Sequence, residues 1–460
     1  MKPERNNTVD NNVFDAVKNT RRDFLKTLGV AALGAGSTML DPALVLADTQ
    51  YKNAAEIMCG APGEELAWYY LRDQFALKPG LIHMNTGTEG AMPRSVFSKI
   101  GGYFETFASN PMYYSIEDPT FRIGLQEVCA KVAGFVGANT DEITMTTNTT
   151  EGLGFCASGL DLKEDDEVLV SKNFEPYDTC WRFLRDRRNI TFTEVELPTP
   201  ATNSDEIVNN FRNAISPKTK VMSFCHINYT TGLQMPVKEL CQLASENNII
   251  TVIDGAHAIG MIDVDLHDIG CDFYAAALHK WLCAPPGTGI LYMKKESQQY
   301  ICATVSEWYT ENNPYLCFIM RGQQCSPAYV AVMDAIDFQN AIGKDKIQSR
   351  VLALSTYTKD KIVEEWGRDA LLSPTEEALS TGLVAFNPFG TRYGPKYGGD
   401  IANLYNALVE ENIVTRPIAF MDKLADTQFT KILRISTHIY NGIDQINKMI
   451  DVAKKAIITV

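Results

Sequence analysis

Lys280 is the residue of this chain whose type and position best suit covalent chemistry. It follows the apolar run 271–276 and precedes the loop Cys283-Ala284-Pro285-Pro286-Gly287. A lysine at the end of an apolar strand can lose its proton and form a Schiff base with a carbonyl compound, which a solvated lysine does poorly. Because a lysine before a Gly/Pro loop is also a common solvated strand end, the chemical interpretation depends on its neighbours.

Asp254 is the first of these neighbours. It follows the apolar run 249–253 and opens the segment Asp254-Gly255-Ala256-His257. A carboxylate at this point can keep the pyridine nitrogen of pyridoxal 5'-phosphate (PLP) protonated, which makes the ring an electron sink, and His257 can support the ring or its phenolic oxygen. Taken singly, an aspartate that caps a turn and a hydrogen-bonded histidine are the ordinary alternatives.

A candidate anion site comes earlier in the chain. Asn148-Thr149-Thr150-Glu151-Gly152 follows the run 142–147 and precedes a stretch compatible with a helix. Hydroxyl groups and free backbone N–H groups at a helix N-terminus bind anions well, and they suit the phosphate of PLP. Such an N-cap motif is common, so it indicates a phosphate site only because it is expected in the same sheet as Lys280 and Asp254.

Short β-branched runs alternate with helical stretches along the chain. This alternation predicts an α/β fold with a mainly parallel sheet and helices on both faces, in which ligands collect beyond the carboxyl ends of the strands. Isoleucines at 443, 446, 450 and 457 recur at helical spacing and predict a helix on a smaller C-terminal α+β domain. The predicted strands are 142–147, 167–170, 190–195, 220–225, 249–253, 271–276 and 289–293.

The N-terminus resembles a twin-arginine export signal. Thr20-Arg21-Arg22-Asp23-Phe24-Leu25-Lys26 leads into the weakly apolar stretch 27–40, and Val45-Leu46-Ala47 offers a cleavage site before Asp48. We therefore expect residues 1–47 to be a signal peptide for the twin-arginine translocase, and the mature protein to be periplasmic without a membrane anchor. The alternative is a basic amphipathic tail. This route carries folded proteins, which suits an enzyme that acquires its cofactor in the cytoplasm.

The composition excludes some partners. The formal net charge is −14, and removal of the leader makes the mature chain slightly more acidic. An acidic balance argues against nucleic acid or an anionic membrane as a partner. The eleven cysteines show neither CxxC pairs nor zinc-ligand spacing, which predicts that most are buried free thiols and that there is no metal site.

Together these features resemble the class V branch of the fold type I PLP enzymes, and most of all its isopenicillin N epimerase group. Leu278-His279-Lys280-Trp281-Leu282-Cys283-Ala284-Pro285 is close to the lysine motif of that group, and the likeness extends from about Asn85-Thr86-Gly87 to Arg434-Ile435-Ser436-Thr437-His438 and just beyond. With its export signal, the chain is also similar to the periplasmic aminotransferase that tailors pyoverdine.

The resemblance implies a role for each candidate site residue. Lys280 is the catalytic residue and forms the Schiff base with PLP, and Arg434 clamps the substrate carboxylate through a bidentate fork, which a lysine could not do equally well. The remaining implied contacts are Asp254 at the pyridine nitrogen, His257 and Asn228 near the phenolic oxygen, Thr149, Thr150 and His279 at the phosphate, Tyr177 stacked on the ring, and Asn85 on the substrate side.

The resemblance also implies a homodimer and a division into domains. We expect residues 48–80 to pack with the small domain, residues 81–325 to form the large PLP-binding domain, and residues 326–460 to form the small one. Two positions depart from the family pattern. Gly322-Gln323 stands where many relatives have Gly-Thr, whose threonine reaches a phosphate in the partner subunit, and Ala277 stands where cysteine desulfurases have a phosphate-binding serine.

PLP by itself does not dictate the reaction, because the protein groups around the reacting carbon choose it. Desulfuration requires a mobile cysteine shortly before the carboxylate-binding arginine, but no cysteine lies between Cys325 and Arg434. Racemisation requires a second acid/base, whereas transamination requires only Lys280. The sequence therefore favours transamination of an amino acid or peptide-like metabolite. An epimerase or racemase, a C–S lyase and a PLP-fold binding protein without turnover stay open.

Overall fold

The computed structural model describes residues 54, 57–58, 64–111, 125–172, 179–306, 314–389, 397–398, 400–420 and 430–459. All of these belong to one compact unit, Ala47–Val460. The predicted signal peptide, residues 1–47, and the predicted stacking residue Tyr177 lie outside the described residues.

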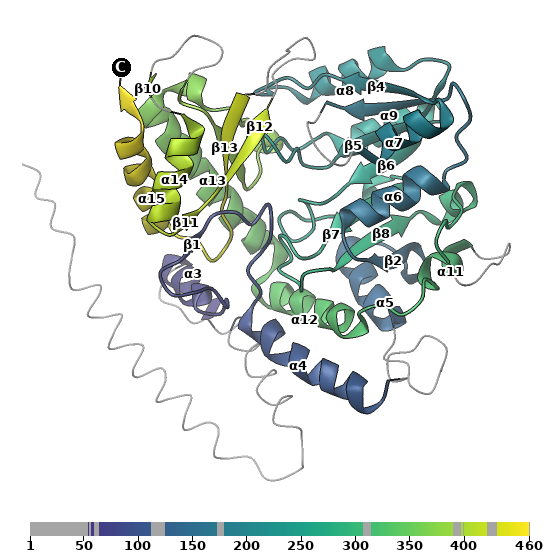
Figure 1. The fold of residues 1–460 in the computed structure, drawn as a ribbon, viewed down its shortest axis with the longest axis horizontal. Helices are drawn as coiled ribbons and strands as arrows, with labels where there is room; N and C mark the ends of the chain where they lie inside the picture. Colours follow the sequence, from purple (N-terminus) through teal and green to yellow (C-terminus); the bar gives the residue numbers. More distant parts are fainter. Residues whose placement is uncertain are drawn as a thin grey trace, which may run out of the picture. The chain divides into compact units, whose positions relative to one another are not determined.

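A seven-stranded sheet forms the centre of the larger domain (Figure 1). The strand order is β2-β8-β7-β6-β5-β3-β4, with all neighbours parallel except β7–β8 and β8–β2. This confirms the predicted mainly parallel sheet, and the strands lie within two residues of their expected bounds. They are β2 (Ile143–Thr146), β3 (Glu167–Ser171), β4 (Thr191–Val195), β5 (Thr219–Cys225), β6 (Ile250–Asp254), β7 (Phe273–Ala277) and β8 (Gly289–Met293).

Helices cover both faces of this sheet. The connections β3 to β4 and β5 to β6 step in opposite directions across the sheet, so right-handed crossovers put α7 and α9 on opposite faces. Helix α6 packs beside α7, and α8 packs beside α9. The helices of this part are α5 (Leu125–Val136), α6 (Thr149–Gly159), α7 (Thr179–Arg188), α8 (Ser204–Ala214), α9 (Val237–Glu246), α10 (Leu266–Ile269) and α11 (Pro314–Ile319).

A three-stranded antiparallel sheet, in the order β12-β13-β9, forms the smaller domain. Its apolar face and the helices around it form a second core that includes Leu404, Leu433 and Ile450. The predicted C-terminal helix is confirmed as α15. The elements are α13 (Lys344–Trp366), β9 (Leu383–Phe386), α14 (Ile401–Glu410), β11 (Ile413–Val414), β12 (Arg416–Phe420), β13 (Thr430–Ser436) and α15 (Ile443–Ala456), with the short pair β10 (Tyr397–Gly398) and β14 (Ile458–Thr459).

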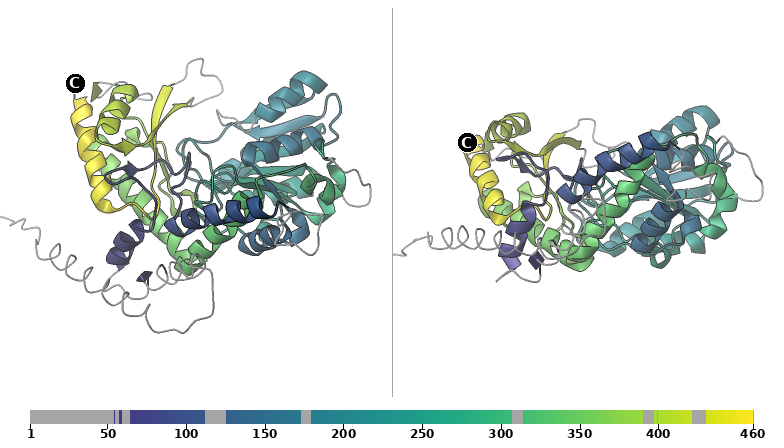
Figure 2. Two further views of the ribbon diagram at one scale, coloured as in Figure 1. Left: turned by 60° about the horizontal axis from the view of Figure 1, so that its bottom comes forward. Right: turned by 90° about the horizontal axis from the view of Figure 1, so that it is seen from below.

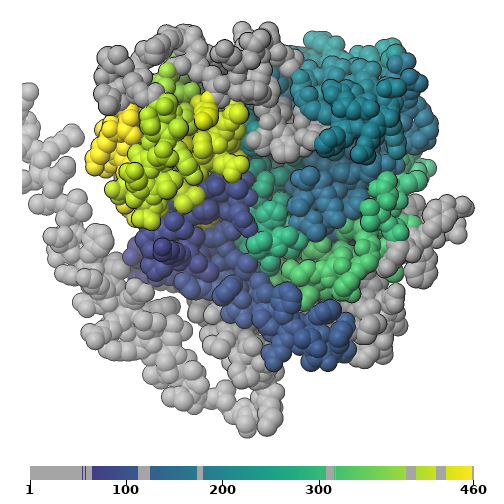
Figure 3. Space-filling view, viewed as in Figure 1, coloured from purple at the N-terminus to yellow at the C-terminus, as the bar shows by residue number. Residues whose placement is uncertain are grey.

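The N-terminal part of the described chain packs against the smaller domain. Strand β1 (Ile82–His83) pairs in parallel with β11. Arg72, the last residue of α3 (Glu64–Arg72), forms an ion pair of 3.1 Å with Asp444 of α15. In Figure 3 the purple N-terminal residues accordingly lie against the yellow C-terminal ones. This segment carries the loop 85–90 toward the edge of the large sheet.

The predicted boundary between residues 325 and 326 stays a prediction. Helix α12 (Ser326–Ile342), which follows it, packs against α5 and along α4 (Arg94–Ser109), as Figures 1 and 2 show. The long helix α13 then contacts α12, α15 and β9. Among the described helices, none combines the length and apolarity needed to cross a membrane.

Candidate active site

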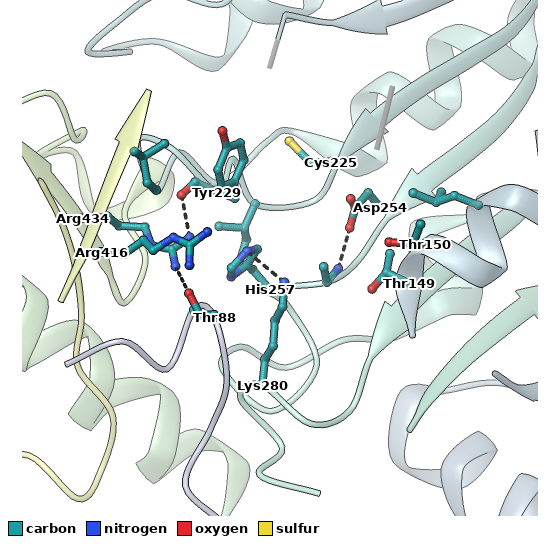
Figure 4. Close-up of a pocket in the computed structure, with 15 residues that line it drawn as sticks. Thr88, Thr149, Thr150, Cys225, Tyr229, Asp254, His257, Lys280, Arg416 and Arg434 are labelled. Atoms are coloured by element: carbon teal, nitrogen blue, oxygen red, sulfur yellow. Dashed lines mark hydrogen bonds between the residues drawn. The ribbon is translucent and has the colours of Figure 1, made fainter. Parts of the chain in front are cut away.

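A cavity of about 200 Å³ lies beyond the carboxyl ends of β5 and β6. Parallel sheets bind ligands at this edge, where neighbouring connections turn to opposite faces. Here β3 and β5 are the adjacent strands whose connections diverge. Side chains from both domains and from the loop 85–90 line the cavity: Gly87, Thr88, Thr149, Thr150, Leu153, Cys225, Ile227, Tyr229, Asp254, Ala256, His257, Lys280, Arg416, Ile418 and Arg434 (Figure 4).

Lys280 enters the cavity from the loop that follows β7. Its Nζ lies 3.4 Å from Nε2 of His257. On the other side of the imidazole, Nε1 of Trp281 donates a hydrogen bond of 3.2 Å to Nδ1 of His257. An indole N–H can only donate, so Nδ1 is the acceptor, and the neutral ring carries its proton on Nε2. That Nε2–H faces the amine of Lys280, which attacks a carbonyl group once it has lost its proton.

His257 is buried, and its pKa is lowered well below the usual value. Desolvation is the main cause, and the positive charges of Lys280 and Arg434 act in the same direction. His257 is therefore neutral at physiological pH. In this state it positions the lysine amine without adding another positive charge to the cavity.

Asp254 is the last residue of β6, and its Oδ1 accepts a hydrogen bond of 2.8 Å from the backbone N–H of Ala256. Burial raises the pKa of Asp254, against the opposing effects of this hydrogen bond and of the Lys280 charge. A buried carboxylate whose desolvation is not offset by its neighbours is stabilised by a cationic partner. The protonated nitrogen of a pyridine ring is such a partner.

The predicted anion site is formed by the first turn of α6. Asn148 is the N-cap, and its side-chain oxygen accepts a hydrogen bond of 2.9 Å from the backbone N–H of Glu151. Thr149 and Thr150 follow and line the cavity, and the buried Oγ1 of Thr149 has no hydrogen-bond partner. A buried hydroxyl group without a partner next to a helix N-terminus fits the phosphate of PLP.

Arg434 approaches from the smaller domain, on β13. Its Nη1 donates to the Tyr229 carbonyl oxygen at 3.2 Å, and its Nη2 donates to Thr88 Oγ1 at 2.9 Å and to Asn85 Oδ1 at 3.2 Å. Asn85 thus holds the guanidinium group, although it is not among the residues that line the cavity. These contacts fix the arginine at the end of the cavity opposite Thr149 and Thr150 (Figure 4).

Two other predicted residues lie near the cavity without lining it. The Asn228 side-chain oxygen accepts hydrogen bonds from Thr230 and from the backbone N–H of Thr231, and so shapes the loop after β5. His279 Nδ1 lies 3.1 Å from the Thr288 carbonyl oxygen. Their predicted contacts with PLP stay predictions. Gln323, at the predicted dimer contact, is exposed and donates to the Gln324 carbonyl oxygen.

Sequence reasoning did not select several residues that line the cavity. Thr88 belongs to the segment that begins at Asn85, and its position within that motif could have drawn attention to it. Arg416 stands in Thr415-Arg416-Pro417, where no local pattern distinguishes it from a surface arginine. Cys225 and Tyr229 reach the cavity because β5 ends there.

Comparisons with known proteins agree with this geometry. The model of the aminotransferase class V family matches residues 85–449. The chain is 30% identical to an isopenicillin N epimerase of Streptomyces clavuligerus, over 84% of this chain and 97% of that protein. It is 26% identical to a putative L-cysteine desulfhydrase of Oryza sativa subsp. japonica, over 82% of this chain and 83% of the other.

Solved structures share the fold of this chain. A cysteine desulfurase from Thermococcus onnurineus NA1 superposes with a TM-score of 0.72 at 20% identity, over 84% of this chain and 97% of that chain. The family model covers most of the chain, and the arrangement of Lys280, Asp254 and Thr149 fits the cofactor of that family. The chain therefore belongs to the class V aminotransferase family, a family of PLP-dependent enzymes with the type I fold.

Proposed function

We propose that this enzyme transaminates an amino acid or a peptide-like metabolite outside the cytoplasm. The observation that carries the proposal is the position of one amine, Lys280, between an anion site at α6 and a fixed arginine on β13. When bound, PLP supplies an electron sink for the bonds at the amino-bearing carbon and takes up the amino group. The chain's own residues then have to hold the substrate and move protons.

Each residue has one task in this proposal. Thr149, Thr150 and the N-terminus of α6 hold the cofactor phosphate, and Asp254 pairs with the ring nitrogen. Arg434 binds the substrate carboxylate and so orients the amino-bearing carbon toward Lys280. Lys280 Nζ moves the proton at that carbon, with His257 Nε2 next to it.

Epimerisation is the second candidate, because a relative at 30% identity is an isopenicillin N epimerase and because Tyr229 and Cys225 line the cavity. Either side chain offers a second proton donor for the face opposite Lys280. A C–S lyase activity is supported by the putative desulfhydrase relative. Desulfuration is disfavoured, because the chain lacks a cysteine between Cys325 and Arg434. A PLP-fold binding protein would not need Lys280 beside a neutral histidine.

A half-reaction screen tests the proposed activity. Purified PLP-loaded enzyme is mixed with amino acids and peptide metabolites, and its absorption is followed while the products are analysed for keto compounds, configuration and sulfide. We expect conversion to the pyridoxamine form with a keto or aldehyde product, reversed by a keto acid. Inversion of configuration without the pyridoxamine form would identify an epimerase, and release of sulfide, or of pyruvate without the pyridoxamine form, would identify a lyase. Binding with none of these would identify a non-catalytic protein.

Covalent attachment is measured separately from turnover. Borohydride reduction followed by peptide mapping should find PLP on Lys280, and Lys280→Ala should lose the label and all turnover. A label on another lysine would contradict the assignment.

The periplasmic location rests on Arg21 and Arg22 and the stretch that follows them. Replacing both arginines by lysine should leave folded, PLP-loaded precursor in the cytoplasm, whereas the mature wild-type protein should begin near Asp48. Fractionation with N-terminal sequencing measures both results. Unchanged export of the double variant would show that another route carries the protein.

A further inference from the structure

Arg416 lies beside Arg434 at one end of the cavity. The two residues face each other in the antiparallel register of β12 and β13. Side chains directly opposite each other on neighbouring strands point to the same face of the sheet. Both arginines line the cavity, as does Ile418, two residues further along β12. Figure 4 shows both guanidinium groups pointing into the cavity from the smaller domain.

The surroundings of the two arginines differ. Arg434 is buried and held by Tyr229, Thr88 and Asn85. Arg416 is exposed, and within the part of the chain that the structure describes its side chain has no hydrogen bond, ion pair or ring contact. One arginine is therefore fixed in place before a ligand arrives, whereas the other is available to a ligand.

Among the described residues that line the cavity, both arginines lie at one end of it. Two like charges directly opposite each other destabilise a sheet unless an anion lies between them. His257 is neutral because its pKa is lowered, and Asp254 lies at the other end, with the anion site of α6 (Figure 4). Among the described residues that line the cavity, Asp254 is the only carboxylate. The cofactor phosphate is assigned to α6, so neither group neutralises the arginine pair.

We propose that Arg416 and Arg434 bind a substrate with two separate anionic groups. Arg434 binds the carboxylate at the reacting carbon, and Arg416 binds the second group, a carboxylate at the end of an amino acid side chain or elsewhere in a peptide-like metabolite. The proposal rests on the proposed action at an amino-bearing carbon and names the substrate class for it. The exposure of Arg416 leaves room for the distal part of such a substrate to extend toward solvent.

Paired ligands test the proposal by binding alone. Spectral titration of the PLP-loaded enzyme gives an apparent Kd for aspartate, glutamate and 2-aminoadipate and for the corresponding side-chain amides. A charge-assisted contact predicts that the best anionic ligand binds about ten- to a hundredfold more tightly than its amide. Arg416→Gln should remove this preference and leave binding of the amides unchanged. Arg434→Gln should weaken the binding of the acid and of its amide by similar factors.

The matched control is Arg187→Gln, because Arg187 is an exposed arginine of α7 that does not line the cavity. It should keep the wild-type preference. A wild-type enzyme that binds none of the acids more tightly than its amide, or a preference that survives Arg416→Gln, would overturn the inference. Failure of the proposed function looks different, since the preference for acids over amides would then persist while the half-reaction gives no pyridoxamine form.

Discussion

His257 connects the reactive lysine to the packed core through its two ring nitrogens. Trp281 is fully buried and donates to Nδ1, which leaves Nε2 to face Lys280. The orientation of the lysine amine is thus set by a residue that does not reach the cavity. Substitutions of residues that hold different parts of the cofactor should therefore affect different properties, either PLP affinity or turnover.

Thr149→Val tests the phosphate contact. Valine has nearly the shape of threonine, but it lacks the buried Oγ1 that has no partner in the structure. The protein without cofactor should be as stable as the wild type or slightly more stable, because an unsatisfied hydroxyl group is removed. PLP affinity should fall by about ten- to a hundredfold, the loss of one hydrogen bond to a charged group. Thermal unfolding and equilibrium dialysis measure the two results.

Asp254→Ala should show the opposite pattern. The phosphate contacts remain, so we expect PLP binding to fall less than turnover, which loses the electron sink. Turnover within a few-fold of the wild type would show that Asp254 is not the partner of the ring nitrogen. A variant of Thr149 that keeps full PLP affinity would equally contradict the phosphate assignment.

At the level of elements, the anion site depends on how closely α6 approaches the sheet. A Cβ atom at Gly152 would lie 2.8 Å from Cβ of Ala275 on β7, whereas a Cβ at Gly154 would meet nothing within 4 Å. Gly152 therefore lets the first turns of α6 pack directly on the strand that leads to Lys280. The contact sets the position of Thr149 relative to the lysine loop.

Gly152→Ala and Gly154→Ala form a matched pair in one helix. Both changes raise helix propensity, by about 1 kcal/mol. Only Gly152→Ala forces α6 away from β7, so we expect it to lower both PLP affinity and the thermal midpoint, whereas Gly154→Ala should leave PLP affinity unchanged and keep or raise the midpoint. Equal effects of the two substitutions would show that the close packing is not required.

Across the whole molecule, burial keeps most histidines neutral. The pKa values of five of the six histidines are lowered, with desolvation as the largest cause, and those of His226 and His438 fall to about 4. His226 contacts Tyr274 of the large domain, and His438, after β13, contacts the Trp281 carbonyl oxygen. The other three are His83, His257 and His279.

These shifts predict that the protein loses stability as pH falls from about 6.5 to 4. In this window the unfolded chain binds protons on histidines that the folded chain leaves neutral, so the free energy of unfolding decreases with decreasing pH. The raised pKa of Asp254 acts in the opposite direction but is a single group. Thermal midpoints at fixed scan rate should be flat between about pH 7 and 8 and fall below about 6.5. His438→Gln should reduce the fall, and an unchanged pH profile in that variant would contradict the assignment.

Local sequence patterns predicted the seven strands of the large sheet and the type of cofactor. Alternating apolar runs fix the strands within two residues because a parallel strand has to be apolar on both faces. Asp254 ends a strand, and Lys280, Thr149 and Thr150 stand just after strands, so local sequence places all four at one edge of the sheet. The motif around Lys280 then points to the family.

The residues that complete the cavity became known from the packing of the folded chain. Arg416 carries no local signal, and it reaches the site because the register of β12 with β13 sets it opposite Arg434. Asn85 acts through Arg434, although the two residues lie far apart in the sequence. Trp281 sets the tautomer of His257 from a separate loop. Register and domain packing follow from the sum of many buried contacts, and no short segment of sequence contains that sum.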